Sequence, residues 1–148
     1  MTLNVQIKKL RNNAQIPVYS TEESAGADIK ACIDNEITIK PGDVEIIPTG
    51  IAMMLPKGFE ASVRPRSGLA AKNHVTVLNT PGTIDSDYRG EVKVILINHG
   101  KQTFTIENGM RIAQIVINRH EQARFDENDF DENSTSRATG GFGSTGMK

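Results

Sequence analysis

The stretch FEASVR, residues 59–64, alternates apolar and polar side chains along its whole length. Phe59, Ala61 and Val63 fall on one side of an extended chain, and the three polar residues fall on the other. A period of two is the pattern of a strand that buries one face and exposes the other. FEASVR therefore predicts a half-buried β-strand.

The same period recurs in TLNVQI (2–7), EVKVIL (91–96) and TFTI (103–106). Turn signals rich in Gly, Pro and Asn lie between such stretches: KPGD (40–43), PTG (48–50), LPKG (55–58), NHGK (98–101) and ENG (107–109). Short strands with frequent turns are typical of all-β folds. We therefore predict an all-β sandwich, barrel or jelly roll.

One short segment has the composition of a helix. SGLAAKN, residues 67–73, contains good helix formers and begins with Ser67, a residue type that is favoured as an N-cap. No other window has a sustained helical stripe of apolar residues. We predict a single helix of one or two turns here, with Ser67 as its cap.

The composition changes after residue 120. EQARFDENDFDENSTSR, residues 121–137, is acidic and poor in branched apolar residues, which indicates an extended, solvated segment. We therefore predict a β domain over residues 1–120 and a flexible arm over 121–148. The arm ends in RATGGFGSTG (137–146), which is either a free tail or a phosphate-wrapping loop that orders over a ligand.

Bulk properties limit the partners that we expect. With 17 basic and 18 acidic residues among 148, the net charge is -1, which argues against a duplex nucleic-acid binder. The longest apolar runs, IAMML (51–55) and VILI (94–97), are too short to span a membrane. One cysteine, Cys32, allows no internal disulfide, and no signal peptide is evident. We predict a soluble, cytoplasmic protein with no nucleic-acid or membrane partner.

The stretch with the most chemical groups is GTIDSDYRGEV, residues 82–92. VTVLN and EVKVIL lie on either side of it, so we expect Asp85 and Tyr88 near a hairpin bend. Asp and Ser favour bends for conformational reasons, but a carboxylate held in a turn also positions a water as a general base. An aromatic ring beside it is suited to face a sugar or a base.

Three further stretches carry polar groups. RPRSGLAAK (64–72) combines arginines with a Ser-Gly helix start, which forms either an anion site or a solvated edge. AGADIKA (25–31) places Asp28 at the start of a strand after a glycine. GMRIAQIVI (109–117) places Gln114 within an apolar strand, where it is more often a satisfied core group than a ligand contact.

In this order and at these spacings, AGADIKA, RPRSGLA, GTIDSDYRGEV, GMRIAQIVI and RATGGFGSTG resemble the five motifs of the deoxyuridine triphosphatases (dUTPases). The resemblance covers Ala25 to Gly146. Two positions depart from the pattern: Met110 stands where an acidic or polar residue is expected, and Pro81 precedes the glycine of the third motif. Neither position has a proposed chemical role.

The resemblance implies a homotrimer of jelly-roll-like subunits that hydrolyses dUTP to dUMP and pyrophosphate with Mg²⁺. This activity keeps uracil out of DNA and supplies dUMP for thymidylate synthesis. The three sites would lie between subunits, and the arm of one subunit would close over the site of a neighbour.

The resemblance also implies roles for individual residues. Asp85 would activate the attacking water and bond the deoxyribose 3′-hydroxyl, Tyr88 would pack under that sugar, and Phe142 would stack on uracil. Asp28 would contact Mg²⁺ through water. The other substrate-binding positions would be Arg66, Ser67, Gly68, Asn79, Thr83, Ile84, Lys93, Gln114, Arg137, Gly143 and Ser144.

Two alternatives are consistent with the same fold. A deoxycytidine triphosphate deaminase shares it but needs a different acid–base set, and would release ammonia. A non-catalytic nucleotide-binding jelly-roll module would bind a nucleotide without turnover.

Overall fold

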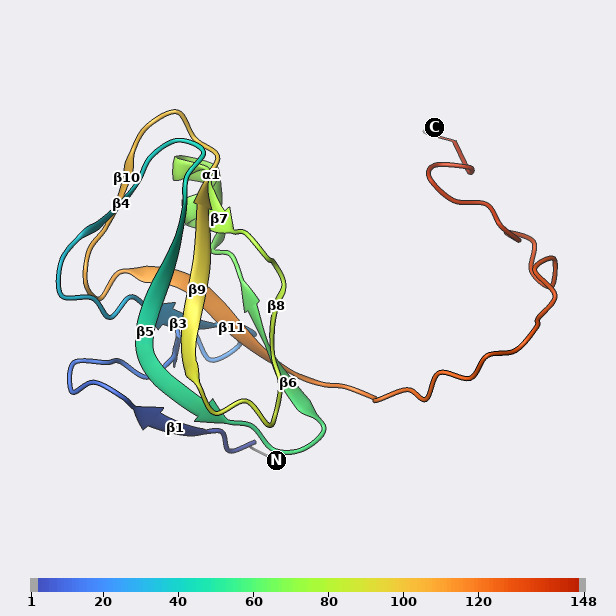
Figure 1. Cartoon of the computed structure of the whole chain (residues 1–148), viewed down its shortest axis with the longest axis horizontal. Coiled ribbons are helices and arrows are strands. Elements are labelled where there is room, and N and C mark those ends of the chain that lie inside the picture. Colours follow the sequence, from blue (N-terminus) through green and yellow to red (C-terminus); the bar gives the residue numbers. More distant parts are fainter. Residues whose placement is uncertain (1–2, 147–148) are drawn as a thin grey trace.

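Two antiparallel sheets pack face to face in the computed structural model, which describes residues 3–146 (Figure 1). The four-stranded sheet has the order β1-β5-β9-β7 and consists of β1 (Gln6–Lys9), β5 (Val44–Met54), β9 (Glu91–Asn98) and β7 (Val75–Val77). The five-stranded sheet has the order β2-β3-β11-β6-β8 and consists of β2 (Val18–Tyr19), β3 (Ala27–Lys30), β11 (Arg111–Arg119), β6 (Phe59–Arg64) and β8 (Gly82–Ile84). A two-stranded ribbon pairs β10 (Phe104–Ile106) with β4 (Ile37–Ile39). The predicted all-β class is confirmed.

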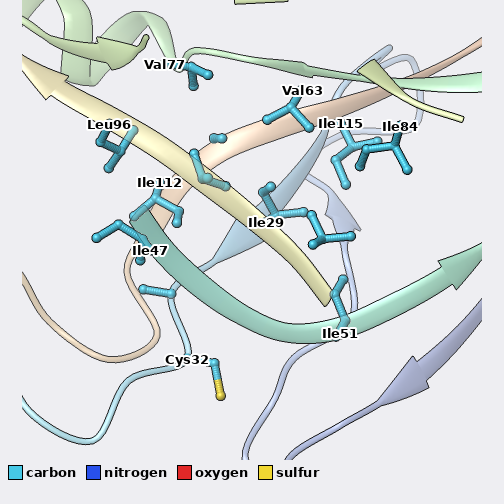
Figure 2. Close-up of a cluster of buried hydrophobic side chains, with 14 of the residues drawn as sticks. Ile29, Cys32, Ile47, Ile51, Val63, Val77, Ile84, Leu96, Ile112 and Ile115 are labelled. Carbon is cyan, nitrogen blue, oxygen red and sulfur yellow. The ribbon is translucent and has the colours of Figure 1, made fainter. Parts of the chain in front are cut away.

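The core lies between the two sheets and consists mainly of β-branched side chains (Figure 2). Ile47 and Ile51 of β5 and Leu96 of β9 come from one sheet, and Ile29 of β3 and Ile115 of β11 come from the other. All five are almost completely buried. Burying one such side chain stabilises the fold by roughly 1.5–3 kcal/mol, so the alternation in the sequence is the main source of the two-layer architecture.

Strand bounds agree with the sequence pattern to different degrees. FEASVR forms β6 with the predicted bounds, whereas β1 begins only at Gln6, β9 continues to Asn98 and β10 begins at Phe104. Hydrogen bonding to neighbouring strands sets these ends, and the side-chain pattern does not report it.

The stretch before Asp85 differs more strongly from the prediction. VTVLN and EVKVIL do contain paired strands, β7 and β9, but the stretch between them is not a simple bend, because residues 82–84 form β8, which pairs with β6 in the five-stranded sheet. Residues 85–90 therefore connect the five-stranded sheet to β9 in the four-stranded sheet.

The helix α1 spans Ser67–Asn73, as predicted, but Ser67 is not its N-cap. Arg66 is the cap residue, with extended backbone angles (φ -90°, ψ 129°) and no side-chain capping bond. Its guanidinium instead bonds Asp28, and Ser67 is the first helical residue. The helix ends at His74, whose backbone is left-handed (φ 57°) and whose N–H donates to the carbonyl of Ala70.

After β11 ends at Arg119, the chain leaves the sheets and extends away from the domain (Figure 1). Residues 120–146 contain no strand or helix, and Phe125, Phe130 and Phe142 are almost fully exposed. The domain boundary at residue 120 stays a prediction. Between residues 3 and 146, no helix is long and apolar enough to cross a membrane.

Asn98 joins the four-stranded sheet to the β4–β10 ribbon. This side chain has no exposed surface, and its Nδ2 donates to the carbonyls of Ile39 and Gln102, each at 2.8 Å. Its Oδ1 accepts from the N–H of Gly100 at 2.8 Å. One buried amide therefore bonds three backbone groups, of which the carbonyl of Ile39 is in the buried interior.

We expect Asn98→Ala to lower the free energy of unfolding by about 3 kcal/mol, because it leaves the buried carbonyl of Ile39 unpaired and removes the bonds to Gln102 and Gly100. Urea unfolding at fixed protein concentration measures this loss. Asn12→Ala removes the same group from an exposed position and should change stability by less than about 0.5 kcal/mol. Equal stability of the two variants would contradict the proposed contribution of Asn98.

Candidate functional site

A first pocket, the Asp85 pocket, has a volume of about 380 Å³ and lies where residues 85–90 cross between the sheets. Its lining comes mainly from β8, β9 and this connection: Ile46, Thr83, Ile84, Asp85, Tyr88, Glu91, Val92, Lys93 and Ile95. Five of the positions named from the sequence therefore share one pocket. Four lining residues were not among them: Glu91 and Val92 end the GTIDSDYRGEV motif but were given no role, and Ile46 and Ile95 lie outside the five motifs.

Tyr88 is fixed against its own loop. Its hydroxyl donates to the carbonyl of Glu91 at 2.9 Å. A Cβ added at Gly90 would lie 2.4 Å from that hydroxyl oxygen and 2.6 Å from the ring, closer than real Cβ atoms approach. Only glycine at position 90 leaves room for the ring, which explains the Tyr-Arg-Gly sequence of the loop.

The Asp85 carboxylate is exposed at the mouth of this pocket. Within residues 3–146 it accepts no hydrogen bond and forms no ion pair, whereas its backbone carbonyl accepts from the N–H of Tyr88 at 3.2 Å. Arg89 braces the loop by donating to the carbonyls of Ser86 and Tyr88 at 2.7 and 3.0 Å. The loop thus holds a carboxylate that is available to a water molecule.

A second pocket, the Asp28 pocket, has a volume of about 350 Å³. It is lined by Ser20, Ser24, Ala25, Gly26, Asp28, Arg66, Ser67, Gly68 and Gln114. Five of the positions named from the sequence lie here: Asp28, Arg66, Ser67, Gly68 and Gln114. The two serines of the β2–β3 connection are additional, and no sequence motif identified them.

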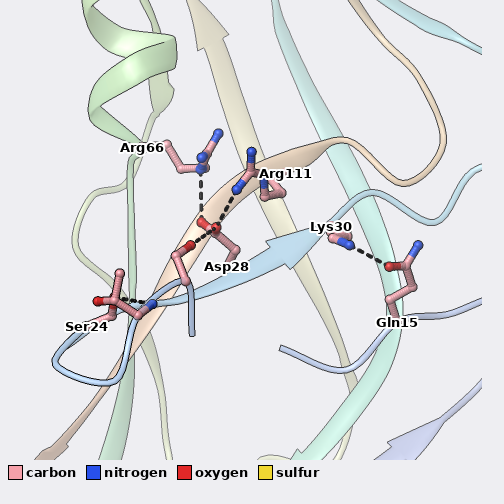
Figure 3. Close-up of polar contacts among 8 residues, drawn as sticks. Gln15, Ser24, Asp28, Lys30, Arg66 and Arg111 are labelled. Carbon is pink, nitrogen blue, oxygen red and sulfur yellow. Dashed lines mark hydrogen bonds and ion pairs between the residues drawn. The ribbon is translucent and has the colours of Figure 1, made fainter. Parts of the chain in front are cut away.

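Asp28 is the centre of a charged cluster (Figure 3). Its Oδ1 accepts from Nε of Arg66 at 2.9 Å. Its Oδ2 accepts from Nη1 of Arg111 at 3.3 Å and from Oγ of Ser20 at 3.2 Å. The Asp28 side chain is only 12% exposed, so this carboxylate is held on both sides.

Gln114 reaches the same pocket from the central strand β11, opposite Asp28 of β3. Its Nε2 donates to the carbonyl of Pro65 at 3.0 Å. A Cβ added at Gly26 would lie 2.2 Å from its Oε1, so glycine there leaves room for the amide. The sequence left Gln114 open as either a core group or a ligand contact; it lies half-buried at the pocket wall.

The two pockets share no lining residue. Asp28 lies on β3 and Asp85 directly follows β8, both in the five-stranded sheet, but β11 and β6 separate these strands, which places them about 14 Å apart at the usual spacing. One chain therefore does not bring Asp85 and Asp28 into a single pocket.

The remaining predicted residues lie outside both pockets. Asn79 is exposed in the turn between β7 and β8, and its Nδ2 lies beside Gly82. The arm residues Arg137, Phe142, Gly143 and Ser144 lie in the extended segment, away from the sheets.

The pockets define an all-β protein with a free carboxylate beside an aromatic ring and a separate pocket containing guanidinium, hydroxyl and amide groups. Such groups suit a nucleotide with a sugar at one end and phosphates at the other. Comparison with known proteins is more specific. The chain belongs to the dUTPase family, whose family model matches residues 12–146.

Individual relatives agree. The deoxyuridine 5′-triphosphate nucleotidohydrolase of Rickettsia bellii (strain OSU 85-389) is 58% identical over 144 residues, covering 97% of this chain and 95% of that protein. That of Rickettsia akari (strain Hartford) is 57% identical and covers 97% of each chain. The structure of the Staphylococcus bacteriophage 80alpha dUTPase with dUpNHpp is 26% identical, with a TM-score of 0.89, covering 99% of this chain and 100% of that chain.

Proposed function

We propose that this protein hydrolyses dUTP to dUMP and pyrophosphate, and so keeps uracil out of DNA while supplying dUMP for thymidylate synthesis. Family membership supports the reaction. The observation that carries the mechanism is the unpaired Asp85 carboxylate beside Tyr88 in a pocket of nucleoside size.

Asp85 takes a proton from a water molecule, and the water oxygen attacks phosphorus while the bond to the pyrophosphate leaving group breaks. The same carboxylate accepts a hydrogen bond from the deoxyribose 3′-hydroxyl. Tyr88 is fixed by its hydrogen bond to the carbonyl of Glu91, and the absence of a side chain at Gly90 leaves room for its ring. The ring packs under the sugar, where a ribose 2′-hydroxyl would collide with it. A positioned base typically contributes about 10²–10⁴-fold to the rate.

Uracil is read by the rest of this pocket. Thr83, Ile84 and the β9 backbone near Lys93 form the wall, and Asn79 approaches from the turn before β8. Cytosine reverses one donor and one acceptor on its pairing edge, which leaves buried groups unpaired at about 1–3 kcal/mol each. Thymine adds a methyl group that a close backbone excludes.

The phosphates are bound by the Asp28 pocket and covered by the arm. Arg66, Ser67, Gly68 and Gln114 supply a guanidinium, a hydroxyl, a backbone N–H and an amide to phosphate oxygens. From the arm, Phe142 stacks on uracil and the flexible glycines fold over the terminal phosphates. The arm side chains that act there are Arg137, Gly143 and Ser144.

Asp28 and Gln114 suit a Mg²⁺ ion that is bound mainly by the phosphates of the substrate. In residues 3–146, no three His, Cys, Asp or Glu side chains come together as a metal cage. Mg²⁺ prefers oxygen ligands and retains several waters, and Asp28 and Gln114 offer oxygens that can bond such waters. When bound, the ion neutralises negative charge on the phosphates.

The active form is a homotrimer in which each site combines the Asp85 pocket of one subunit with the Asp28 pocket of another. The separation of the two pockets within one chain supports this arrangement. Residues 120–146 extend from the domain and are long enough to reach a neighbouring subunit, at about 3.3 Å per extended residue.

We expect Asp85→Asn to retain the fold and nucleotide binding but to lower turnover at least about 10²-fold, because the amide cannot accept the proton of the water. Pyrophosphate release from dUTP measures this, with UTP, dCTP and dTTP as control substrates. Ammonia release from dCTP by the parent protein would instead indicate a deaminase, and binding without turnover would indicate a non-catalytic module. Near-parent turnover by Asp85→Asn would show that Asp85 is not the base.

Mixing two inactive variants tests the shared site. Asp85→Asn damages only the first pocket, and Arg66→Gln damages only the second. If each site takes its two pockets from different subunits, random mixed trimers should recover about a quarter of the parental activity. Unfolding and refolding the mixture, followed by sedimentation and assay, gives the result. Absence of recovery in mixed trimers, or an active monomer, would contradict the arrangement.

Removing the chain after Asn133 tests the arm. The deletion removes residues 134–148, of which residues 134–146 are exposed except for Gly140 and contribute nothing to the core, so the β domain should stay folded and trimeric. Activity should fall nearly to background, because Arg137, Phe142 and Ser144 are lost. Circular dichroism and sedimentation serve as controls for folding and assembly. Full activity of the shortened protein would mean that the segment is only a tail.

A further inference from the structure

We propose that Arg111 is a positioning residue, which occupies one oxygen of Asp28 and thereby leaves the two terminal nitrogens of Arg66 available to the phosphates of the substrate. This inference rests on the proposed function of the Asp28 pocket. Arg111 itself does not line that pocket; it lines a separate pocket, to which Arg66 also contributes.

Each of the two carboxylate oxygens of Asp28 bonds a different arginine. Arg66 donates to Oδ1 through Nε only, at 2.9 Å, and Arg111 donates to Oδ2 through Nη1, at 3.3 Å (Figure 3). Within residues 3–146, neither Nη1 nor Nη2 of Arg66 donates a hydrogen bond. Arg66 is therefore anchored at its inner nitrogen while its outer nitrogens remain free.

An arginine and a carboxylate prefer a two-bonded arrangement, in which both oxygens accept from one guanidinium. In that arrangement Arg66 would donate to Asp28 through Nε and one Nη, and one of its four terminal N–H groups would no longer be available to phosphate. Arg111 prevents this by competing for Oδ2. Ser20 also bonds Oδ2, at 3.2 Å, but it is uncharged and a weaker competitor.

Charge adds to the same effect. Asp28 and Arg66 are the only charged residues that line the Asp28 pocket, and their charges cancel. Arg111 is bonded to the same carboxylate and gives the three-residue cluster a net charge of about +1, which favours a triphosphate. The Arg111 side chain is 52% exposed, and exposed ion pairs contribute little to folding stability, so its loss should not unfold the protein.

The test uses Arg111→Gln in the full-length protein. We expect dUpNHpp, measured by calorimetry with Mg²⁺, to bind about 10-fold more weakly, the scale of one lost charge-assisted hydrogen bond. KM for dUTP should rise with kcat nearly unchanged. The inhibition constant of deoxyuridine, which has no phosphates, should not change. A crystal structure of the variant should show Arg66 bonded to both oxygens of Asp28.

Three further variants distinguish positioning from general loss of charge. Arg119→Gln removes the same charge from the same strand, far from Asp28, and should bind dUpNHpp like the parent. Arg111→Lys, which can still occupy Oδ2, should restore part of the affinity. In an Asp28→Asn background, where no two-bonded pair can form, Arg111→Gln should add little to the effect of Asp28→Asn.

Two results would overturn the proposal for Arg111 alone: parental affinity for dUpNHpp in Arg111→Gln, or additive effects of Arg111→Gln and Asp28→Asn. A parent protein that neither hydrolyses dUTP nor binds dUpNHpp would overturn the proposed function instead. The two failures are therefore distinguishable in the same set of measurements.

Discussion

The pairing of β11 with β3 on one side and with β6 on the other is the constraint on which the remaining structure depends. β11 buries Ile112 and Ile115 in the core, and a shift of one residue would expose them, so its register is fixed by burial. That register places Gln114 opposite Asp28 and Arg64. Three segments that are far apart in the sequence thereby form one wall of the Asp28 pocket.

The fold was predictable from the sequence because burial follows a local pattern. FEASVR forms β6 with the predicted bounds, although Ser62 on its polar face is buried as well, and SGLAAKN forms the helix. The N-cap at Ser67 was wrong because the cap depends on the backbone of Arg66, whose side chain is held by Asp28 from another strand. β8 was not predicted, because a strand of three residues is too short to show an alternation of apolar and polar side chains.

The candidate site was predictable as a list of residues but not as an arrangement. The motifs point to Asp85, Tyr88, Asp28 and Gln114, and the structure places them in two pockets. The separation of these pockets follows from sheet order, which no local stretch encodes. Arg111 lies inside a quoted motif, yet its pairing with Asp28 depends on a register between strands about 80 positions apart.

The loop that carries Asp85 and Tyr88 begins in one sheet and ends in the other. The width of the Asp85 pocket is therefore tied to the distance between the sheets, which the core side chains set. A substitution that thickens or thins the core would therefore change the volume of this pocket without altering any residue that lines it. Under the proposed function, discrimination between pyrimidines would in this sense also depend on the interior.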